Sequence, residues 1–283
     1  MLENSTGVNE WTGTGKKSTF SLRKKRKDLR LKDRIAEKLI EIETMENVKI
    51  LHAVESGSRA WGFASPDSDY DVRFIYARPR ESYLKLEKMR DVIEWQLDET
   101  LDINGWDIQK ALRLLHKSNP TVFEWSQSPI IYKTTPFFEH FGEVASNYFS
   151  SKSGLYHYLN TARGNYSGYI TKKDMVKYKK YFYVLRPILA CRWILDRNSP
   201  PPMLFSELVD QQLEEGMKPI VFELLEKKTV MSEIGEGKKI DVLNEYIERQ
   251  FDLVLKAIES MPREHAKSWE KVNNLFLLSL DTE

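Results

Sequence analysis

Cysteine is nearly absent from this chain: the 283 residues include one, Cys191. A single cysteine cannot form an intramolecular disulfide, so the sequence excludes a disulfide-stapled domain and favours a reducing compartment. Cys191 stands in an apolar segment with helical spacing. We therefore expect its side chain to be part of the core and not a reactive thiol.

Long apolar runs are absent as well. No uninterrupted apolar stretch reaches the roughly 20 residues that cross a bilayer. The N-terminal segment also lacks the apolar core of a secretory signal peptide. The sequence therefore predicts a cytoplasmic protein with no membrane partner.

The five histidines lack the spacing of metal ligands. The chain contains neither Cys-x-x-Cys nor His-x-x-x-His, so no zinc site is expected. His52 stands inside an apolar run and is predicted to be a core residue. The segment Gly13 to Ser18 resembles a phosphate-binding P-loop only superficially. Position 10 is Glu where the P-loop has glycine, and Lys17 occupies the place of the required Ser or Thr.

Net charge is close to zero, at +1, but it is distributed unevenly. Residues 1–34 carry ten Lys or Arg against four Asp or Glu, so the remainder is mildly acidic. Residues 1–28 are polar and show little periodicity, which predicts a disordered basic arm. Its cluster from Arg23 to Lys27 either contacts nucleic-acid phosphates or is an ordinary solvated tail.

The spacing of apolar residues divides the chain into a strand-rich part and a helical part. After a helix at 30–45, short β-rich runs predict strands, the last two forming an antiparallel hairpin. The predicted strands are residues 48–54, 72–77, 92–97 and 101–106. From residue 136 the pattern is almost entirely helical and includes a long helix at 172–196. We therefore predict an α+β fold, with a small mixed-sheet domain over 29–133 and a helical lobe over 134–283.

The candidate chemistry lies between Gly57 and Asp107. Asp69 and Asp71 stand at the start of a strand, and residues two apart on a strand point to the same face. Two carboxylates held that close repel each other unless a cation lies between them, and all-oxygen ligands suit Mg²⁺. The preceding Gly57-Ser58 turn can offer N–H groups and a hydroxyl to phosphate oxygens. This combination indicates phosphoryl or nucleotidyl transfer.

Gly57-Ser58, ten intervening residues and then Asp69-Tyr70-Asp71 resembles the signature of the DNA polymerase β-like nucleotidyltransferase superfamily. A wider set of motifs resembles one branch, the predicted nucleotidyltransferases also called the RNA-repair-pathway DNA polymerase β family. These motifs are Glu55 to Gly62, Ser68 to Arg73, Gly105 to Asp107 with Lys110, Ser118 to Pro120, Glu124 with Trp125, and Ser128 with Pro129. The resemblance runs from about residue 32 into the C-terminal region and implies a polymerase β-like palm domain.

The resemblance also implies a third carboxylate on a later strand, for which Asp102 and Asp107 are the candidates. Being five residues apart, they would lie on opposite faces of an extended strand. We favour Asp107 because it belongs to the Gly-Trp-Asp motif, although it also stands where the next helix needs an N-cap. The implied cofactor is a pair of Mg²⁺ ions, replaceable by Mn²⁺, on Asp69, Asp71 and Asp107.

The implied nucleotide site combines the turn with the helical lobe. Gly57 and Ser58 are expected to hold the β- and γ-phosphates, and Arg59 to neutralise them. Lys180 and Arg186 are expected to contact the triphosphate, since the helical lobe of this superfamily commonly closes over the nucleotide. The alternative for these two residues is a solvated charged helix face.

The function that these expectations imply is transfer of NMP from ATP or another NTP to a hydroxyl acceptor, with release of pyrophosphate. An RNA 3′ end is one candidate acceptor and fits the basic arm. A protein or a small molecule is the alternative, because the sequence shows no aromatic-basic platform for single strands. A non-catalytic nucleotide-binding module is disfavoured, because the Gly-Ser turn and the carboxylates are all present.

Overall fold

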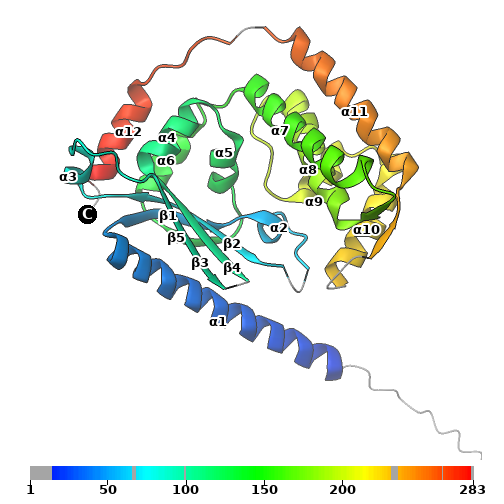
Figure 1. The fold of residues 1–283 in the computed structure, drawn as a ribbon, viewed down its shortest axis with the longest axis horizontal. Helices are drawn as coiled ribbons and strands as arrows, with labels where there is room; N and C mark the ends of the chain where they lie inside the picture. Colours follow the sequence, from blue (N-terminus) through cyan, green and yellow to red (C-terminus); the bar gives the residue numbers. More distant parts are fainter. Residues whose placement is uncertain (1–14, 66–67, 99, 231–234, 263, 282–283) are drawn as a thin grey trace, which may run out of the picture. The chain divides into compact units, whose positions relative to one another are not determined.

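The computed structural model describes residues 15–65, 68–98, 100–230, 235–262 and 264–281. The chain divides into two compact units, residues 1–46 and 47–283. Helix α1, Gly15–Glu46, is the described part of the first unit (Figure 1). It begins well before the expected residue 30, because Lys, Arg and Leu all favour helix and extend it through the basic run. Residues 1–14 of the predicted arm lie outside the described residues.

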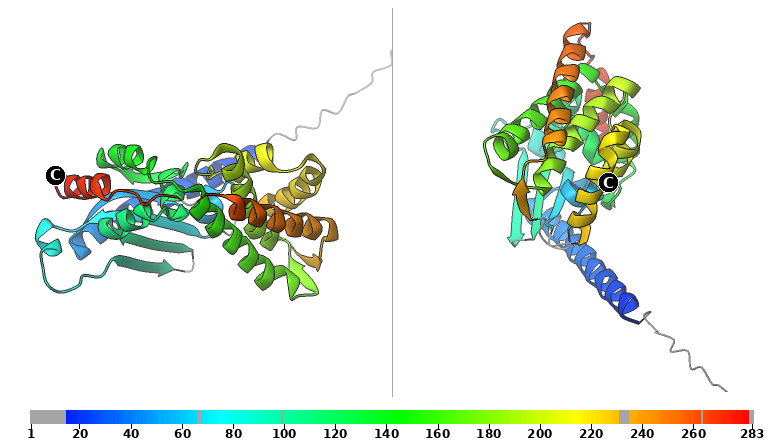
Figure 2. Two further views of the ribbon diagram at one scale, coloured as in Figure 1. Left: turned by 90° about the horizontal axis from the view of Figure 1, so that it is seen from above. Right: turned by 90° about the vertical axis from the view of Figure 1, so that its right-hand side faces the viewer.

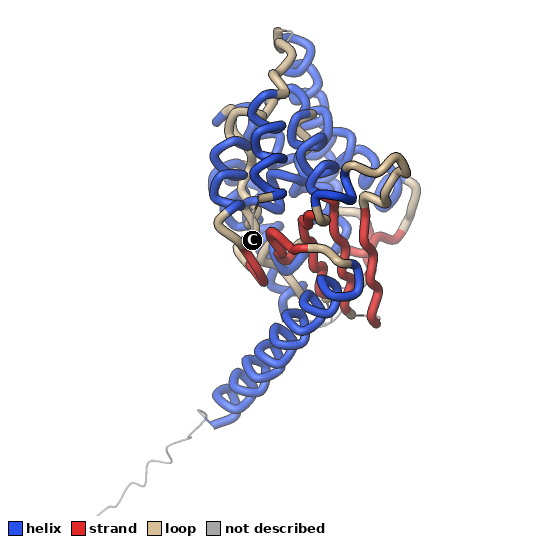
Figure 3. Tube along the Cα trace, turned by 90° about the vertical axis from the view of Figure 1, so that its left-hand side faces the viewer, coloured by secondary structure: helices blue, strands red, loops and turns tan. Residues whose placement is uncertain are grey.

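A five-stranded mixed sheet of order β3-β4-β2-β1-β5 forms the first part of the second unit (Figures 1 and 3). The strands are β1 (Lys49–Glu55), β2 (Tyr70–Ala77), β3 (Val92–Asp98), β4 (Leu101–Asp107) and β5 (Ile131–Thr134). β2 and β4 are parallel, and the other neighbours are antiparallel. The four expected strands and their hairpin are confirmed, β5 is added at an edge, and the fold is α+β as predicted.

Helices pack over one face of this sheet. They are α4 (Ile108–His116), α5 (Pro120–Ser126), α6 (Phe137–Ala145) and the C-terminal α12 (Glu270–Leu280). Leu51 and Ile75 from the sheet share a buried apolar core with Leu112, Phe141 and Leu275 from these helices. Figures 1 and 2 show α12, at the red end of the chain, returning to α4 and α6.

Apart from the one-turn helices α2 (Gly57–Ala60) and α3 (Arg80–Tyr83), the remaining described helices form a second apolar core. They are α7 (Ser151–Tyr166), the π-turn Ser167–Thr171, α8 (Lys179–Arg197), α9 (Phe205–Gln212), α10 (Lys218–Val230) and α11 (Asp241–Ser260), with 3₁₀ turn Glu215–Met217 before α10. Cys191 is fully buried here, as predicted. Phe63, from the loop that leads to β2, inserts into the same core, with its ring 5.4 Å from Phe182 and 5.3 Å from Phe205. This insertion anchors the loop that carries the candidate site.

The helix expected over 172–196 begins only at Lys179. Met175–Lys177 instead forms β6, which pairs with β7 (Glu236–Lys238) in a two-stranded ribbon. Met175, which falls within the predicted helix, is 49% exposed on this ribbon. The expectation failed because the pairing partner of β6 lies about sixty residues further along the chain, beyond any local pattern. No helix in the described part of the chain is long and apolar enough to cross a membrane.

Candidate active site

β1 ends at Glu55, and Ser56 separates it from the Gly57-Ser58 turn. Gly57 has a φ of +60°, which suits glycine, and it opens the short helix α2 (Gly57–Ala60). A Cβ at this position would lie 2.1 Å from Oδ2 of Asp71. The turn and the carboxylate are therefore in direct contact, and only glycine leaves room for both.

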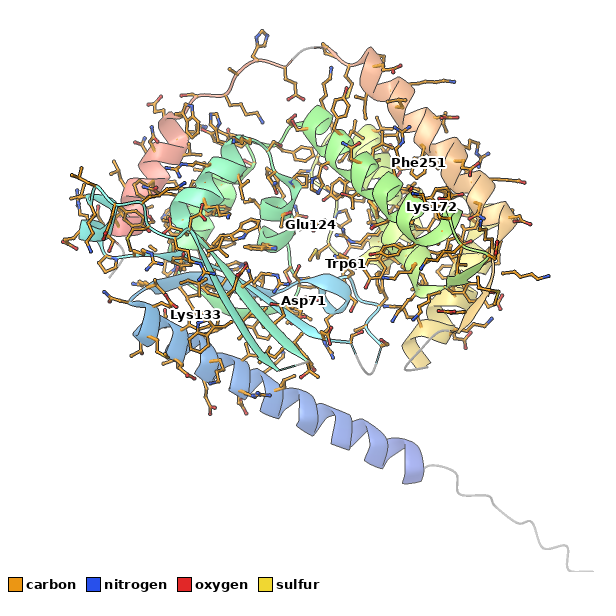
Figure 4. The ribbon with its side chains drawn as sticks, in the orientation of Figure 1. Trp61, Asp71, Glu124, Lys133, Lys172 and Phe251 are labelled. Carbon is orange, nitrogen blue, oxygen red and sulfur yellow. The ribbon has the colours of Figure 1, made fainter. Side chains whose placement is uncertain are left out.

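A cavity of about 440 Å³ opens between this turn, the start of β2 and α8. It is lined by Gly57, Ser58, Trp61, Ser65, Ser68, Asp69, Asp71, Lys179, Tyr183 and Lys228. Four residues proposed from the sequence, Gly57, Ser58, Asp69 and Asp71, thus meet at one cavity, and Figure 4 shows Asp71 and Trp61 where the sheet meets the helical lobe. A larger cavity of about 670 Å³ near α5, α6 and α7 contains none of the proposed residues.

Asp102 lies beside Asp71, because β2 and β4 are parallel neighbours in the register that pairs these two residues. The Arg73 guanidinium joins them, with one nitrogen 3.1 Å from Asp71 Oδ1 and 2.7 Å from Asp102 Oδ2. Burial raises the pKa of Asp71; Arg73 counteracts the shift, whereas Asp102 and Asp69 add to it. The acidic group beside the turn is therefore Asp69, Asp71 and Asp102.

The structure does not bring Asp107, the favoured candidate from the sequence, into this group. Asp107 lies five residues further along β4 than Asp102, and its neighbour on β2 is Tyr76. At about 3.3 Å per residue this is about 16 Å away, on the other face of the strand. Its Oδ1 accepts the N–H of Gln109 at 2.8 Å as the N-cap of α4, and the Tyr83 hydroxyl donates to Oδ2 at 2.9 Å.

The rest of the Gly-Trp-Asp motif has a packing role too. A Cβ on Gly105 would lie 2.2 Å from the Phe74 ring, so glycine lets the aromatic ring lie across β4. The Trp106 ring lies 4.0 Å from that of Trp125 on α5. The motif therefore fixes α4 and α5 on the sheet, while the acidic site uses the opposite end of β4.

Arg59 holds the loop before β2 in place. Its Nε donates to the Asp69 carbonyl at 2.9 Å, and a terminal nitrogen donates to the Ser68 carbonyl at 2.6 Å. The guanidinium also lies 3.5 Å from the centre of the Tyr70 ring. Arg59 was proposed to neutralise phosphates, but in this structure it is bound to the backbone that presents Asp69.

Glu55 is a site residue that sequence reasoning did not single out. Its fully buried carboxylate accepts the N–H of Asp71 at 2.9 Å and the hydroxyl of Tyr132. Burial raises its pKa to about 7, against the smaller lowering effect of these hydrogen bonds. The available signal was an acidic residue at the end of a largely apolar strand, at the start of the motif Glu55 to Gly62.

The two cations proposed on the long helix lie outside the cavity lining. Lys180 Nζ lies over two aromatic rings, 3.9 Å from the centre of the Tyr169 ring and 5.0 Å from that of Tyr183. It therefore adjoins the cavity through Tyr183. Arg186 is 4% exposed and forms an ion pair with Glu124 of α5 at 2.8 Å. Arg186 therefore ties α8 to α5 through Glu124 and lies outside the lining of the cavity.

The cations that do line the cavity are Lys179 and Lys228. Lys179 is the first residue of α8, and Lys228 lies on α10. The buried Lys228 Nζ donates to the carbonyl of Phe63 at 2.8 Å. Neither was proposed from the sequence. Lys179 was missed because the helix was predicted to begin at residue 172 and not at Lys179. Lys228 was missed because it lies 165 positions from Phe63, whose carbonyl it contacts.

The carboxylates fit a hard cation. Among the described residues, no cluster of three or more His, Cys, Asp or Glu side chains closes around one point. Asp69 and Asp71, however, both line the cavity beside the turn. Mg²⁺ is commonly held by one or two carboxylates and completes its shell with water and substrate phosphates. This pair therefore suits Mg²⁺ or Mn²⁺ in the presence of a phosphate ligand.

Known proteins resemble this chain over most of its length. Residues 31–278 match the RNA repair pathway DNA polymerase beta family, RlaP. The uncharacterized protein YcgL of Bacillus subtilis (strain 168) is 42% identical over 253 residues, which cover 89% of this chain and 97% of that protein. A crystal structure of a nucleotidyltransferase-like protein from Exiguobacterium sibiricum 255-15 has 14% identity and a TM-score of 0.29, over 87% of this chain and 77% of that one. The family match spans most of the chain, and the chain belongs to the RNA repair pathway DNA polymerase beta family.

Proposed function

We propose that the protein is a metal-dependent nucleotidyltransferase, which transfers NMP from an NTP to a hydroxyl acceptor. The observation that carries this proposal is the cavity at the Gly57-Ser58 turn. There Asp69 and Asp71 share the lining with Lys179 and Lys228. Carboxylates for a metal ion and cations for phosphates are thus present in one space of suitable size.

We assign the nucleotide to the side of the cavity formed by the Gly57-Ser58 turn, α8 and α10. We assign the phosphates to the backbone and hydroxyl of Ser58 with Gly57, and to the ammonium groups of Lys179 and Lys228. The buried Trp61 Nε1 has no hydrogen-bond partner among the described residues and lines the same cavity. We assign it as a donor to the nucleotide.

The metal site is assigned to Asp69 and Asp71, and Asp102, not Asp107, is the carboxylate assigned to the position beside it. A bound Mg²⁺ or Mn²⁺ would neutralise charge on the phosphates and the leaving pyrophosphate. Asp71 is well suited to this position, because the Glu55 carboxylate holds its backbone and Gly57 leaves space for its side chain. The two ions implied by the resemblance remain a prediction.

The proposed reaction is an in-line displacement at the α-phosphorus. The acceptor oxygen forms a bond to that phosphorus, the bond to the bridging oxygen of the β-phosphate breaks, and pyrophosphate leaves. The proton of the acceptor hydroxyl passes to water. The acceptor must approach from the side opposite pyrophosphate. We assign this acceptor side to the surface around Asp102, whose side chain is 51% exposed.

We propose an RNA 3′ end as the acceptor, in the cytoplasm. The support is the description of the family and the excess of basic residues in 1–34. A protein or a small molecule as acceptor, or a non-catalytic nucleotide-binding module, are the alternatives that the experiment must separate.

The test incubates the purified protein with each α-³²P-labelled NTP, Mg²⁺ or Mn²⁺, and a pool of short RNAs, tRNA and cell extract. The matched control is Asp69→Asn with Asp71→Asn, which keeps side-chain size and removes charge. Label in RNA that is lost in the control supports the proposal. Label only in protein or a small molecule retains the chemistry and rejects the RNA acceptor. NTP binding without transfer favours the binding module.

A further inference from the structure

Arg73 occupies a bridging position between two of the carboxylates. One of its terminal nitrogens lies 3.1 Å from Asp71 Oδ1 and 2.7 Å from Asp102 Oδ2. These carboxylates come from neighbouring strands and repel each other unless a cation lies between them. In this structure that cation is the guanidinium.

The guanidinium is held rigidly in this position. Its other terminal nitrogen donates to the carbonyl of Val72 at 3.0 Å and to the carbonyl of Asp102 at 3.1 Å. The Arg73 side chain is only 19% exposed. Because arginine keeps its charge at every physiological pH, Arg73 is a permanent cation of the site.

The two oxygens of Asp71 face different neighbours. Oδ1 accepts from Arg73, whereas Oδ2 lies against Gly57, where an added Cβ would come within 2.1 Å of it. A divalent ion on the nucleotide side can therefore use Oδ2 together with Asp69. An ion on the acceptor side, between Asp71 Oδ1 and Asp102, would have to displace Arg73.

The net charge of these side chains also favours one ion on the nucleotide side, with Arg73 on the acceptor side. Asp69, Asp71 and Asp102 carry three negative charges when ionised, and Arg73 offsets one. The remaining two are balanced by one divalent ion. A second ion would make the group electropositive before any phosphate arrives.

We propose that Arg73 takes the acceptor-side cation position, so that the nucleotide-free protein binds one divalent ion, at Asp69 and Asp71, and not two. The inference rests on the proposed function and revises its expected ion count. It makes Arg73 a positioning residue that holds Asp71 and Asp102 in the arrangement a second metal ion would otherwise impose.

The test is a calorimetric Mn²⁺ titration of the full chain without nucleotide, since an NTP brings its own ion. One Mn²⁺ per chain is expected for the unchanged protein and two for Arg73→Gln. The matched control is Arg80→Gln, at an arginine that is 59% exposed and lies beyond the end of β2 opposite to Asp71; it should keep a count of one. Asp69→Asn should lose the ion that the unchanged protein binds.

A second variant keeps the test decisive if Arg73→Gln fails to fold. Asp102→Asn should still bind one Mn²⁺, because the proposed ion does not use Asp102. Two ions in the unchanged protein would overturn the role of Arg73 and leave the proposed function intact. An unchanged count of one in folded Arg73→Gln, or loss of the ion in Asp102→Asn, would also overturn it. No Mn²⁺ binding by any variant would reject the metal site of the proposed function as well.

Discussion

At the scale of single residues, the tightest constraint in the site is the contact between Gly57 and Asp71. We expect Gly57→Ala to lower turnover by at least about 100-fold, because the added methyl group displaces the Asp71 carboxylate. The positive φ should also cost about 1–2 kcal/mol of unfolding free energy. Steady-state kinetics and denaturant unfolding measure the two effects.

The matched control for this variant is Gly164→Ala. Gly164 lies within α7, and an added Cβ meets nothing within 4 Å. Alanine there should stabilise the protein by up to about 1 kcal/mol, through its helix propensity, and leave turnover unchanged. Equal losses of activity in both variants would argue against a special role for the Gly57 contact.

The two aspartates of β4 should respond differently to substitution. Asp107→Ala should lower the free energy of unfolding by about 1 kcal/mol, since α4 loses its N-cap. Asp107→Asn, which keeps a capping oxygen, should change turnover by less than about twofold. Asp102→Asn should lower turnover by about 100-fold, by weakening charge organisation at the acceptor side. The opposite ranking of turnover would restore Asp107 as the third carboxylate.

At the scale of elements, a buried ion pair joins the sheet part to the helical lobe. Glu124 of α5 accepts from Arg186 of α8 at 2.8 Å and from the hydroxyl of Tyr158 on α7 at 2.9 Å. We expect Arg186→Met to lower the free energy of unfolding by about 3 kcal/mol, because it leaves the largely buried Glu124 carboxylate without its cation. Urea unfolding measures the loss.

The double variant Arg186→Met with Glu124→Leu should recover part of this stability, since both charges are then removed. A stable single variant with a raised KM for NTP would instead support the phosphate-binding role proposed from the sequence.

His52, which faces Thr134 in the pairing of β1 with β5, is expected to make the free energy of unfolding depend on pH. His52 is buried, stacks on Phe138 at 3.4 Å and lies 3.1 Å from the Thr134 hydroxyl. Burial lowers its pKa to about 4, so the folded state prefers the neutral ring. A depressed histidine pKa means that stability is present at neutral pH and is lost as pH falls below the unfolded pKa of about 6.5.

From this shift we expect about 2 kcal/mol less stability at pH 5 than at pH 8 from His52 alone. His52→Gln should remove that part of the pH dependence, and His265→Asn, at an exposed position, should not. Denaturant unfolding at both pH values measures the difference. If the free energy of unfolding changed equally between pH 5 and pH 8 in all three proteins, the pKa of His52 would not be lowered by folding.

At the scale of the whole molecule, the cavity is built by distant parts of the chain. Residues 57–71 supply its acidic side, and α8 and α10 supply its cations. An NTP with Mg²⁺ should therefore stabilise residues 47–283 as one cooperative unit, by about 2.7 kcal/mol at a ligand concentration of 100 Kd. Thermal or denaturant unfolding with and without ATP and Mg²⁺ measures this gain, and Asp71→Asn should abolish it. A gain that the variant retains would place the nucleotide elsewhere.

The arrangement of the turn and of the strand that follows it was predictable from the residue order alone. Gly57, Ser58, Asp69 and Asp71 could be assigned because they are close in the chain and their relation follows from strand geometry. The strands up to residue 107 and the helical character of the C-terminal half also followed from local apolar spacing. These properties depend on neighbouring residues, which a linear pattern records.

Which distant residues lie at the cavity depends on how separate segments of the chain pack together. The register of β2 and β4 placed Asp102, not Asp107, beside Asp71. Asp102 also contacts Arg73, which lies 29 positions earlier in the chain. The packing of α8 and α10 brought Lys179 and Lys228 into the cavity and directed Arg186 to Glu124. Strand register and helix packing are set by the joint burial of side chains from separate segments. No local pattern along one segment contains that information.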